Sequence, residues 1–387
     1  MAANRDIIEV LGVVLACEAA ARQEDMQVVH EDAFIALADE LGRGTVTSVL
    51  TLGGFIENDF DAPPLYRYIV SHNMWKKSRV RLPTEYKDKR WVGASSILMA
   101  DGSTLVCGAN DRIGDRMGFV FHATYYQKSG PIETVSFDNF RDEDARTYLS
   151  RSNASLVTLH SGKVLRLGGR VDNRVYGELP LIASNAVYDP DKRPFSPPRF
   201  TNQLSDFGKE RKSLVGGEWD VLDVGTELPW ATVCVVLKSG DVLISGGIIF
   251  MGSERVRAAC LVYYPRENRF LRTGDMVTPR AHHAGCLLPN GRVFVCGGIS
   301  AAAVSRSRVT TCEEYDPTSG VWSQLPGELV ERMGHTCTLL NSGEIFVVGG
   351  WDVEQRCELY DPYLRWVRFA ASLPVRASGF ITVPVSE

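Results

Sequence analysis

The chain has 387 residues, of which 23% are charged, and a formal net charge of −5. It is therefore long enough to bury a large core, and its mild acidity argues against a broad nucleic-acid surface. Nine cysteines without a CxxC pair favour reduced core thiols over a disulfide framework or a zinc site. We expect a protein of the cytoplasm or the nucleus that holds neither a metal nor another cofactor.

Residues 1–43 differ in pattern from the rest of the chain. Apolar residues recur at helical spacing over 7–15, and a second helical pattern covers 33–41. Asp6 and Glu9 argue against a signal peptide, and the apolar stretch is too short and too charged to span a membrane. We predict a short α-helical extension, which either caps the remaining domain or recruits a partner.

From residue 44 onward the sequence repeats one pattern: an apolar run, a turn glycine, a second apolar run and a pair of small residues that begins with glycine. The turn glycine lies six residues before the first glycine of the pair in five copies: Gly102/Gly108, Gly162/Gly168, Gly240/Gly246, Gly291/Gly297 and Gly343/Gly349. With Gly53 there are six such markers, 51 to 78 residues apart. A repeat of roughly 50 residues is typical of a β-propeller of four-stranded blades.

Each repeat continues with a third apolar segment that ends in tyrosine, followed by an aromatic or large apolar residue. The third segments lie at 186–190, 261–265, 313–317 and 358–362, with looser versions at 66–70 and 123–127. The residues expected in the fourth strands are Trp75, Ile132, Phe195, Phe270, Trp322 and Trp366. Residues 133–150 and 199–229 are then expected to be long surface loops.

The double glycine, the downstream tyrosine and the later tryptophan resemble the kelch motif, and this resemblance covers residues 44–387. It implies an all-β fold: a six-bladed kelch propeller of four-stranded antiparallel blades, similar to the central domain of galactose oxidase. We interpret the glycine pairs as structural, because they leave no Cβ where neighbouring blades crowd near the axis.

The two ends of this region predict how the ring closes. Residues 376–387 resemble the first strands that begin at Arg280 and Arg332, where the turn glycine comes eleven residues after the arginine, but here that position is the last residue. Residues 46–54 contain a second strand without a first strand before it. The C-terminal strand is therefore predicted to complete the blade that the start of the propeller begins, which leaves no open edge.

Histidines near the first strands are candidates for a site. His283 and His335 follow the strand-start arginines by three residues, and without a third ligand nearby we interpret them as structural. His282 stands beside His283, and neighbours on a strand face opposite ways. One of the two should therefore face the channel or the rim.

The resemblance implies that ligands dock on one face of the propeller, at residues after the glycine pair and at the start of the first strand. Arginine and tryptophan dominate binding hot spots, and Arg170 matches a place where some kelch adaptors bind a carboxylate. We expect Arg280 and Arg332 to pair with neighbouring carboxylates instead. The candidate partner-binding residues are Arg170, Trp351, His282, Phe55, Asn110, Trp230 and Arg376.

The sequence contains no nucleophile elbow, HExxH motif or phosphate loop. We therefore expect a non-catalytic protein-interaction scaffold or adaptor with a protein partner, and no nucleic acid or membrane. One alternative is a carbohydrate-acting propeller enzyme similar to sialic-acid mutarotases or copper-radical oxidases, whose catalytic residues cannot be matched here. The other is a structural subunit of a larger assembly. Residues 1–43 are too few for a BTB domain and lack the Leu-Pro opening of an F-box. A ubiquitin-ligase or large-assembly link therefore stays open as a partner, without support from a module within this chain.

Overall fold

A computed structural model describes most of the predicted propeller. The described residues are 46–56, 66–77, 95–98, 104–107, 117–121, 133–136, 154–169, 185–190, 218–222, 228–250, 254–302, 305–350, 355–375 and 377–386. Apart from one 3-10 turn, η1 (Val70–His72), their regular structure is entirely β. The predicted N-terminal extension, residues 1–43, lies outside this range, so the proposed domain boundary stays a prediction.

The described strands form six four-stranded antiparallel sheets and two two-stranded hairpins. We number the sheets along the chain and give each from its innermost strand outward. Sheet 1 is β28 (Ala377–Ser386), β1 (Val46–Ile56), β2 (Tyr66–Ile69) and β3 (Met74–Lys77); sheet 2 is β4 (Ser95–Leu98), β5 (Thr104–Cys107), β6 (Met117–Phe121) and β7 (Glu133–Ser136); sheet 3 is β8 (Ser155–Thr158), β9 (Val164–Leu167), β10 (Asn185–Asp189) and β11 (Glu218–Leu222).

The second half of the chain follows the same order. Sheet 4 is β12 (Val233–Val236), β13 (Val242–Ser245), β16 (Cys260–Tyr264) and β17 (Arg269–Arg272); sheet 5 is β18 (Ala284–Leu287), β19 (Val293–Cys296), β22 (Thr311–Asp316) and β23 (Val321–Glu328); sheet 6 is β24 (Thr336–Leu339), β25 (Ile345–Val348), β26 (Cys357–Asp361) and β27 (Trp366–Ala370). The hairpins β14 (Ile248–Phe250)/β15 (Glu254–Val256) and β20 (Ile299–Ala302)/β21 (Ser305–Arg308) follow the glycine pairs of sheets 4 and 5.

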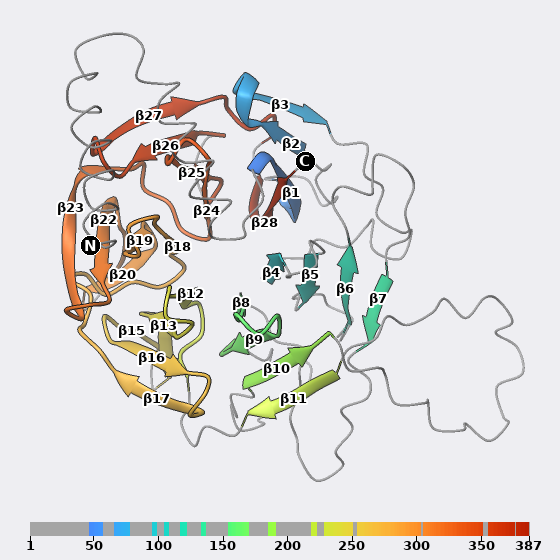
Figure 1. Ribbon diagram of the computed structural model, residues 1–387. Coiled ribbons are helices and arrows are strands. Elements are labelled where there is room, and N and C mark those ends of the chain that lie inside the picture. The colour runs from blue at the N-terminus through green and yellow to red at the C-terminus, as the bar shows by residue number, and fades with distance from the viewer. Residues whose placement is uncertain are drawn as a thin grey trace, which may run out of the picture.

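The sheets stand around a central axis (Figure 1). Their innermost strands contact one another in the cyclic order β28, β4, β8, β12, β18, β24 and back to β28. The fold is therefore an all-β propeller, as the sequence predicts. No helix among the described residues is long and apolar enough to cross a bilayer.

The ring is closed by the two ends of the propeller sequence. β28 pairs antiparallel with β1 along almost its whole length, with Val49 opposite Pro384, Leu50 opposite Val383 and Leu52 opposite Ile381. The C-terminal strand is thus the innermost strand of sheet 1, next to β1. The predicted closure is confirmed.

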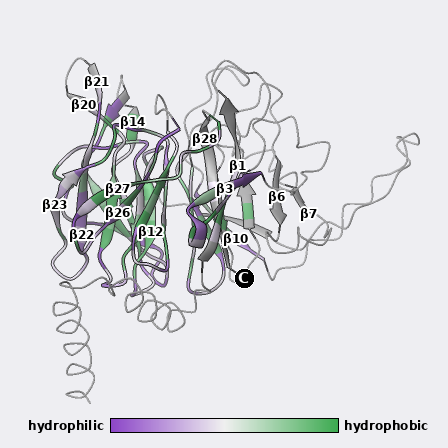
Figure 2. Cartoon of the chain, turned by 90° about the horizontal axis from the view of Figure 1, so that it is seen from above, coloured by the Kyte–Doolittle hydropathy of each residue, from purple (hydrophilic) through white to green (hydrophobic). Residues whose placement is uncertain are grey.

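The core lies between the faces of neighbouring sheets, because each sheet is covered on both sides. Tyr68 of sheet 1 stacks on Phe346 of sheet 6 with ring centroids 4.2 Å apart, and Phe294 of sheet 5 stacks on Tyr360 of sheet 6 at 5.0 Å. The second strands β9, β13, β19 and β25 are buried along their full length. In the side view of Figure 2, hydrophobic residues, coloured green, lie along the described strands.

The glycine pairs allow the backbones of successive sheets to approach closely. Gly246 and Gly247 have φ values of 60° and 94°, in the left-handed region. A Cβ on Gly246 would lie 2.3 Å from the carbonyl oxygen of Arg280, at the start of sheet 5. The N–H of Gly247 donates to that same oxygen at 2.8 Å. This confirms the structural interpretation of the pairs.

The outer strands correct several parts of the predicted repeat. In sheet 2 the third strand is Met117–Phe121, not 123–127, and the fourth is Glu133–Ser136. In sheet 3 the fourth strand is Glu218–Leu222, which lies inside the predicted loop 199–229, and Trp219 rather than Phe195 stands opposite the repeat tyrosine. The long insertion of sheet 3 therefore connects its third and fourth strands.

The aromatic residue of the fourth strand has a fixed register in four of the sheets. Trp75, Trp219, Phe270 and Trp322 each stand directly opposite the repeat tyrosine of the third strand. In sheet 6 the residue opposite Tyr360 is Val367, and Trp366 pairs one position earlier with Asp361. Trp366 is therefore not the fourth-strand aromatic of the repeat, because a shift of one residue turns a side chain to the other face of a strand.

We predict that Gly246→Ala destabilises the protein. The substitution places a Cβ against the Arg280 carbonyl and forces a left-handed conformation on alanine, so it should lower the free energy of unfolding by about 2–4 kcal/mol. Denaturant unfolding measures this value. Gly320→Asn is the matched control, because Asn73 and Asn268 also have positive φ in outer turns, and it should cost less than ~1 kcal/mol. An equal effect of the two substitutions would contradict the close-approach explanation.

Candidate functional site

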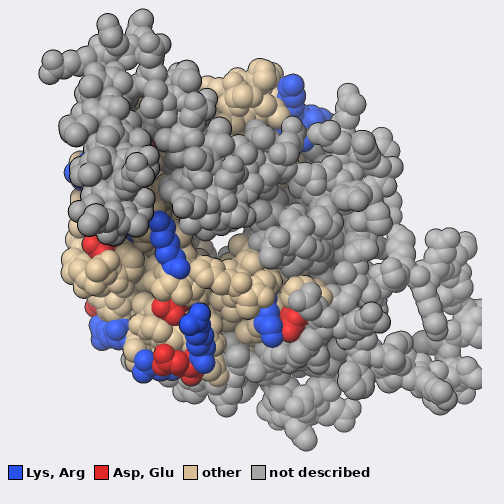
Figure 3. Space-filling view, viewed as in Figure 1, with Lys and Arg blue, Asp and Glu red and all other residues tan. Residues whose placement is uncertain are grey.

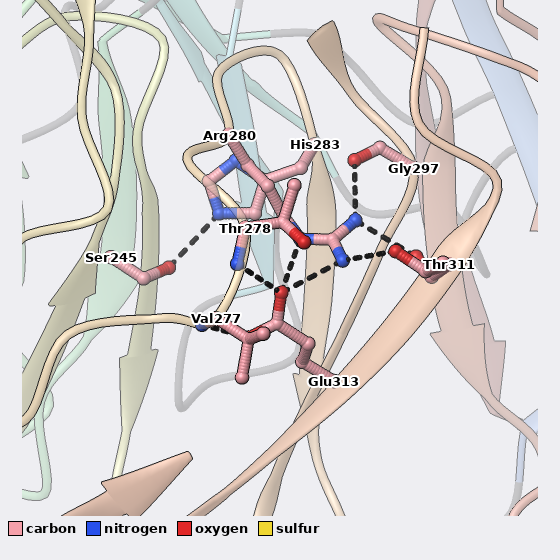
Figure 4. Close-up of polar contacts among 8 residues, drawn as sticks. All are labelled: Ser245, Val277, Thr278, Arg280, His283, Gly297, Thr311 and Glu313. Carbon is pink, nitrogen blue, oxygen red and sulfur yellow. Dashed lines mark hydrogen bonds and ion pairs between the residues drawn. The ribbon is translucent and has the colours of Figure 1, made fainter. Parts of the chain in front are cut away.

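The start of each inner strand in sheets 5 and 6 is held by a buried arginine. Arg280 is fully buried and its guanidinium donates to the Gly297 carbonyl at 3.0 Å and to the Thr311 carbonyl at 2.8 Å (Figure 4). It also donates to one carboxylate oxygen of Glu313 from Nη2 at 2.9 Å and from Nε at 3.1 Å. One side chain thus joins the first, second and third strands of its sheet.

The carboxylate of Glu313 has further donors. The backbone N–H groups of Val277 and Thr278 donate to its two oxygens at 2.7 Å and 3.0 Å. A buried charge is tolerated only when it is paired and hydrogen-bonded, and both conditions are met here. The pair therefore fixes the segment that leads into β18.

Sheet 6 repeats this arrangement. Arg332 is fully buried, pairs with Glu358 and donates to the Gly349 carbonyl at 2.9 Å. The N–H of Val330 donates to Glu358 at 3.1 Å. The expectation that Arg280 and Arg332 pair with neighbouring carboxylates is confirmed, and neither arginine is exposed for a ligand.

His283 and His335 are buried in the seams between sheets. His283 Nε2 lies 3.0 Å from Ser245 Oγ of sheet 4, and His335 Nε2 lies 3.4 Å from Cys296 Sγ of sheet 5. Burial, and then the nearby Arg280 charge, lower the pKa of His283 well below its usual value. The ring is therefore neutral and serves as a link between sheets, which confirms the structural interpretation of both histidines.

His282 has a backbone conformation that the sequence did not predict. Its φ is 54°, and the equivalent residues of sheets 4 and 6, Ala231 and Gly334, have φ values of 55° and 62°. The N–H of His282 donates to the Ala231 carbonyl at 3.1 Å, and the N–H of Gly334 donates to the His282 carbonyl at 2.9 Å. The premise that His282 and His283 alternate along a strand is wrong, because His282 lies in a left-handed turn before β18. The two side chains still differ as predicted, since His283 is buried and His282 is half-buried.

The structure brings two of the predicted site residues together. The Trp230 and His282 rings meet edge to face with centroids 5.5 Å apart, and both side chains are half-buried. Trp230 is bridged to Ile248, the first residue after the glycine pair of sheet 4. Trp230 and His282 therefore sit where the start of an inner strand meets a post-glycine segment.

The post-glycine positions of sheets 4 and 5 are not surface positions. Ile248 and Ile299 are buried in one apolar cluster with Ala231 and Ala281. Phe55 lies in β1, where its backbone is opposite Ser378 of β28. The remaining predicted site residues are outside the described part of the chain: Arg170, Trp351, Asn110 and Arg376.

The hairpins β14/β15 and β20/β21 project from one end of the propeller, and the C-terminus lies at the other (Figure 2). We call the first end the double-glycine end. Arg255 and Arg257, on and beside β15, are exposed there. On the opposite end, basic and acidic side chains are interspersed over the described surface (Figure 3).

The described residues include no group of three or more His, Cys, Asp or Glu side chains arranged to hold a metal ion. The seven cysteines whose side chains the structure describes are all free thiols. The chemistry that this part of the chain offers at the double-glycine end is aromatic packing and hydrogen bonding around a preformed turn.

Glu313 and Glu358 are structural residues that the sequence analysis did not identify. Both stand two positions before the repeat tyrosine, in the segments "EEYDP" and "ELYDP". A carboxylate recurring at one position of the repeat, together with an arginine recurring at another, is the signal that could have predicted the pairs.

The closed ring of four-stranded sheets, with its glycine pairs and buried arginine–glutamate pairs, defines a propeller of the kelch type. The family description "Kelch motif" matches residues 280–327, which run from Arg280 through most of sheet 5. The chain is therefore similar to kelch-repeat proteins, and one kelch motif is matched in sheet 5.

Curated relatives match a part of the chain. Kelch-like protein 15 of Mus musculus and of Homo sapiens are each 30% identical over 131 residues, which are 33% of this chain and 20% of each relative. Kelch-like protein 15 of Gallus gallus is 29% identical over 131 residues, 25% of its length. The match thus spans about a fifth to a quarter of these relatives.

Removing the charge of Glu313 should destabilise the protein. Glu313→Gln leaves the buried Arg280 charge without its partner, so the free energy of unfolding should fall by about 2–4 kcal/mol. The neighbouring Glu314→Gln breaks a surface pair with the half-exposed Arg292 and should cost less than about 1 kcal/mol. Chemical denaturation of both variants checks the difference, and similar losses would show that the buried pair has no special role.

His283 should make the protein less stable in mild acid. Its folded pKa is below the usual 6.5, so below that pH the unfolded state binds more protons and stability falls as the pH falls. His283→Gln should flatten this dependence between about pH 6.5 and 5. Ser245→Ala keeps the buried imidazole and should keep the wild-type slope. Thermal unfolding at several pH values measures the slopes, and an unchanged slope for His283→Gln would refute this assignment.

Proposed function

We propose that this six-bladed kelch propeller is a non-catalytic adaptor that binds a protein partner at its double-glycine end, in the cytoplasm or the nucleus. The observation that carries the proposal is the contact between Trp230 and His282. The candidate residues Arg170, Trp351, Phe55, Asn110 and Arg376 are proposed for this surface from the resemblance alone. Their position in the repeat does not support them, because the equivalent residues Ile248, Ile299 and Arg280 are buried.

The fold itself does not require His282. Sheets 4 and 6 place alanine and glycine at the equivalent turn position, where φ is also positive. A bulky side chain in the left-handed region costs about 1 kcal/mol or more and persists where the surroundings or the function demand it. Backbone strain of this kind clusters at binding sites, and the adjoining Trp230 is a residue type that dominates hot spots.

The charges at this end define the class of partner. Arg255 and Arg257 are exposed there, while Trp230 and His282 supply a half-buried aromatic contact. A partner segment with an apolar or aromatic side chain flanked by carboxylates fits this combination. Among the described residues, no observation favours a carbohydrate-acting enzyme or a structural subunit over this function.

His282→Gly separates binding from stability. The variant should be as stable as the wild type or more stable by ~0.5–1 kcal/mol, because glycine adopts positive φ without strain. A photo-crosslinking residue introduced at Arg255 should capture the partner in cells, and His282→Gly should reduce that capture at least tenfold. The same residue at Asn290, an exposed turn position at the opposite end, is the control. Equal capture with and without His282 would overturn the proposal.

A further inference from the structure

The outermost part of sheet 6 contains a turn that departs from the repeat. Residues 361–366 read "DPYLRW", whereas the matching turn of sheet 5, 316–321, reads "DPTSGV". The two turns are equivalent, because Asp361 pairs with Trp366 as Asp316 pairs with Val321. Sheet 6 thus has tyrosine, leucine and tryptophan where sheet 5 has threonine, serine and valine.

These three side chains are on the surface. Tyr363 is 51% exposed, Leu364 54% and Trp366 45%. By contrast, Trp322 of sheet 5 is 6% exposed and its Nε1 donates to the Gly274 carbonyl at 3.0 Å. We call Tyr363, Leu364 and Trp366 the apolar turn; it is an exposed apolar cluster that the packing of the propeller does not use.

The backbone of this turn is strained as well. Arg365 has a φ of 58°, whereas the outer turns of sheets 1, 4 and 5 place Asn73, Asn268 and Gly320 in the left-handed region. Asparagine and glycine tolerate that region, and arginine does not. Four consecutive positions thus break the local rules of this turn, and such departures mark functional positions more often than structural ones.

Residues 1–45 of this chain have the composition to cover the apolar turn. Their apolar residues Ile7, Ile8, Leu11, Val14 and Leu15 recur at helical spacing, so in a helix they would form one apolar stripe. The same segment contains nine Asp and Glu, three Arg and no Lys. Arg365 is exposed within the apolar turn, and Lys76 and Lys77 are exposed on β3 of the next sheet. The net negative charge of residues 1–45 is therefore complementary to the positive charges on and next to the apolar turn.

The first described residue, Val46, lies at the same end of the ring as the apolar turn. β1 begins at Val46, opposite Ser386 near the C-terminus, and sheet 1 adjoins sheet 6 through β24 and β28. β1 and β25 are the second strands of their sheets, so the start of β1 and the turn at 361–365 lie at the same end of the ring. That end is the one that carries the C-terminus in Figure 2. The 30 residues between Leu15 and Val46 are ample to reach the neighbouring sheet.

From these observations we propose that the apolar stripe at residues 7–15 docks in cis on the apolar turn of sheet 6. This surface lies at the end of the propeller opposite the proposed partner-binding site. The interaction would hold residues 7–15 against the outer edge of sheet 6, the sheet next to the one in which β28 closes the ring.

Photo-crosslinking of the purified full chain tests this proposal. A p-benzoyl-L-phenylalanine residue replaces Leu364, and trypsin, which cuts after Arg5 and Arg22, then releases peptide 6–22. The expected result is a crosslink between residue 364 and peptide 6–22 within a monomer. Ser319, the equivalent exposed position of sheet 5, is the control and should give no such crosslink.

Matched variants make the result decisive. Leu11→Asp in the stripe should reduce the crosslink at least tenfold, whereas Leu11→Ile should retain it. In a second measurement, Leu364→Asp should speed tryptic cleavage after Arg22 about tenfold relative to Ser319→Asp. A dimer-sized product would replace the proposal with docking of a second copy. Absence of a crosslink, or a crosslink to another peptide, would also overturn it.

Discussion

The pairing of the last strand with the first is the interaction on which the rest of the structure depends. β28 forms the inner edge of sheet 1 by pairing with β1 from Val46 to Ile56. Without β28, β1 would lose its inner partner. The innermost strands of the two neighbouring sheets, β24 and β4, would also lose the strand that they contact. Because each sheet is covered only by its neighbours, an open ring would expose apolar faces on two sides.

Closure also sets the geometry of the candidate site. Once the ring is closed, the glycine pairs of sheets 3, 4 and 5 are held against the strand start of the following sheet, as Gly246 is held against Arg280. The buried pair of Arg280 with Glu313 then fixes that strand start from within its own sheet. The turn at His282 hydrogen-bonds to the equivalent turns of the two neighbouring sheets. The closed ring therefore holds the surface proposed for partner binding in a fixed geometry.

Much of this architecture could be predicted from the sequence because its signals are local and repeated. The six-residue spacing of the glycines, and the eleven residues after Arg376 that end the chain, were enough to predict the propeller and its closure. The register of Trp366 could not be predicted, because a shift of one residue depends on which neighbour it pairs with. The fourth strand of sheet 3 was misplaced for a similar reason, since a long insertion separates Trp219 from its tyrosine partner. The left-handed turn at His282 has no sequence signal when alanine and histidine occupy it.

Amide hydrogen exchange of β28 tests the closure most directly. If the C-terminal strand locks the ring, the amides of Thr382 and Val383, opposite Thr51 and Leu50, should exchange only through global unfolding, with the same free energy as the buried amides of β25. Free energies of exchange far below the global value, with β28 fraying while β25 stays protected, would contradict the account.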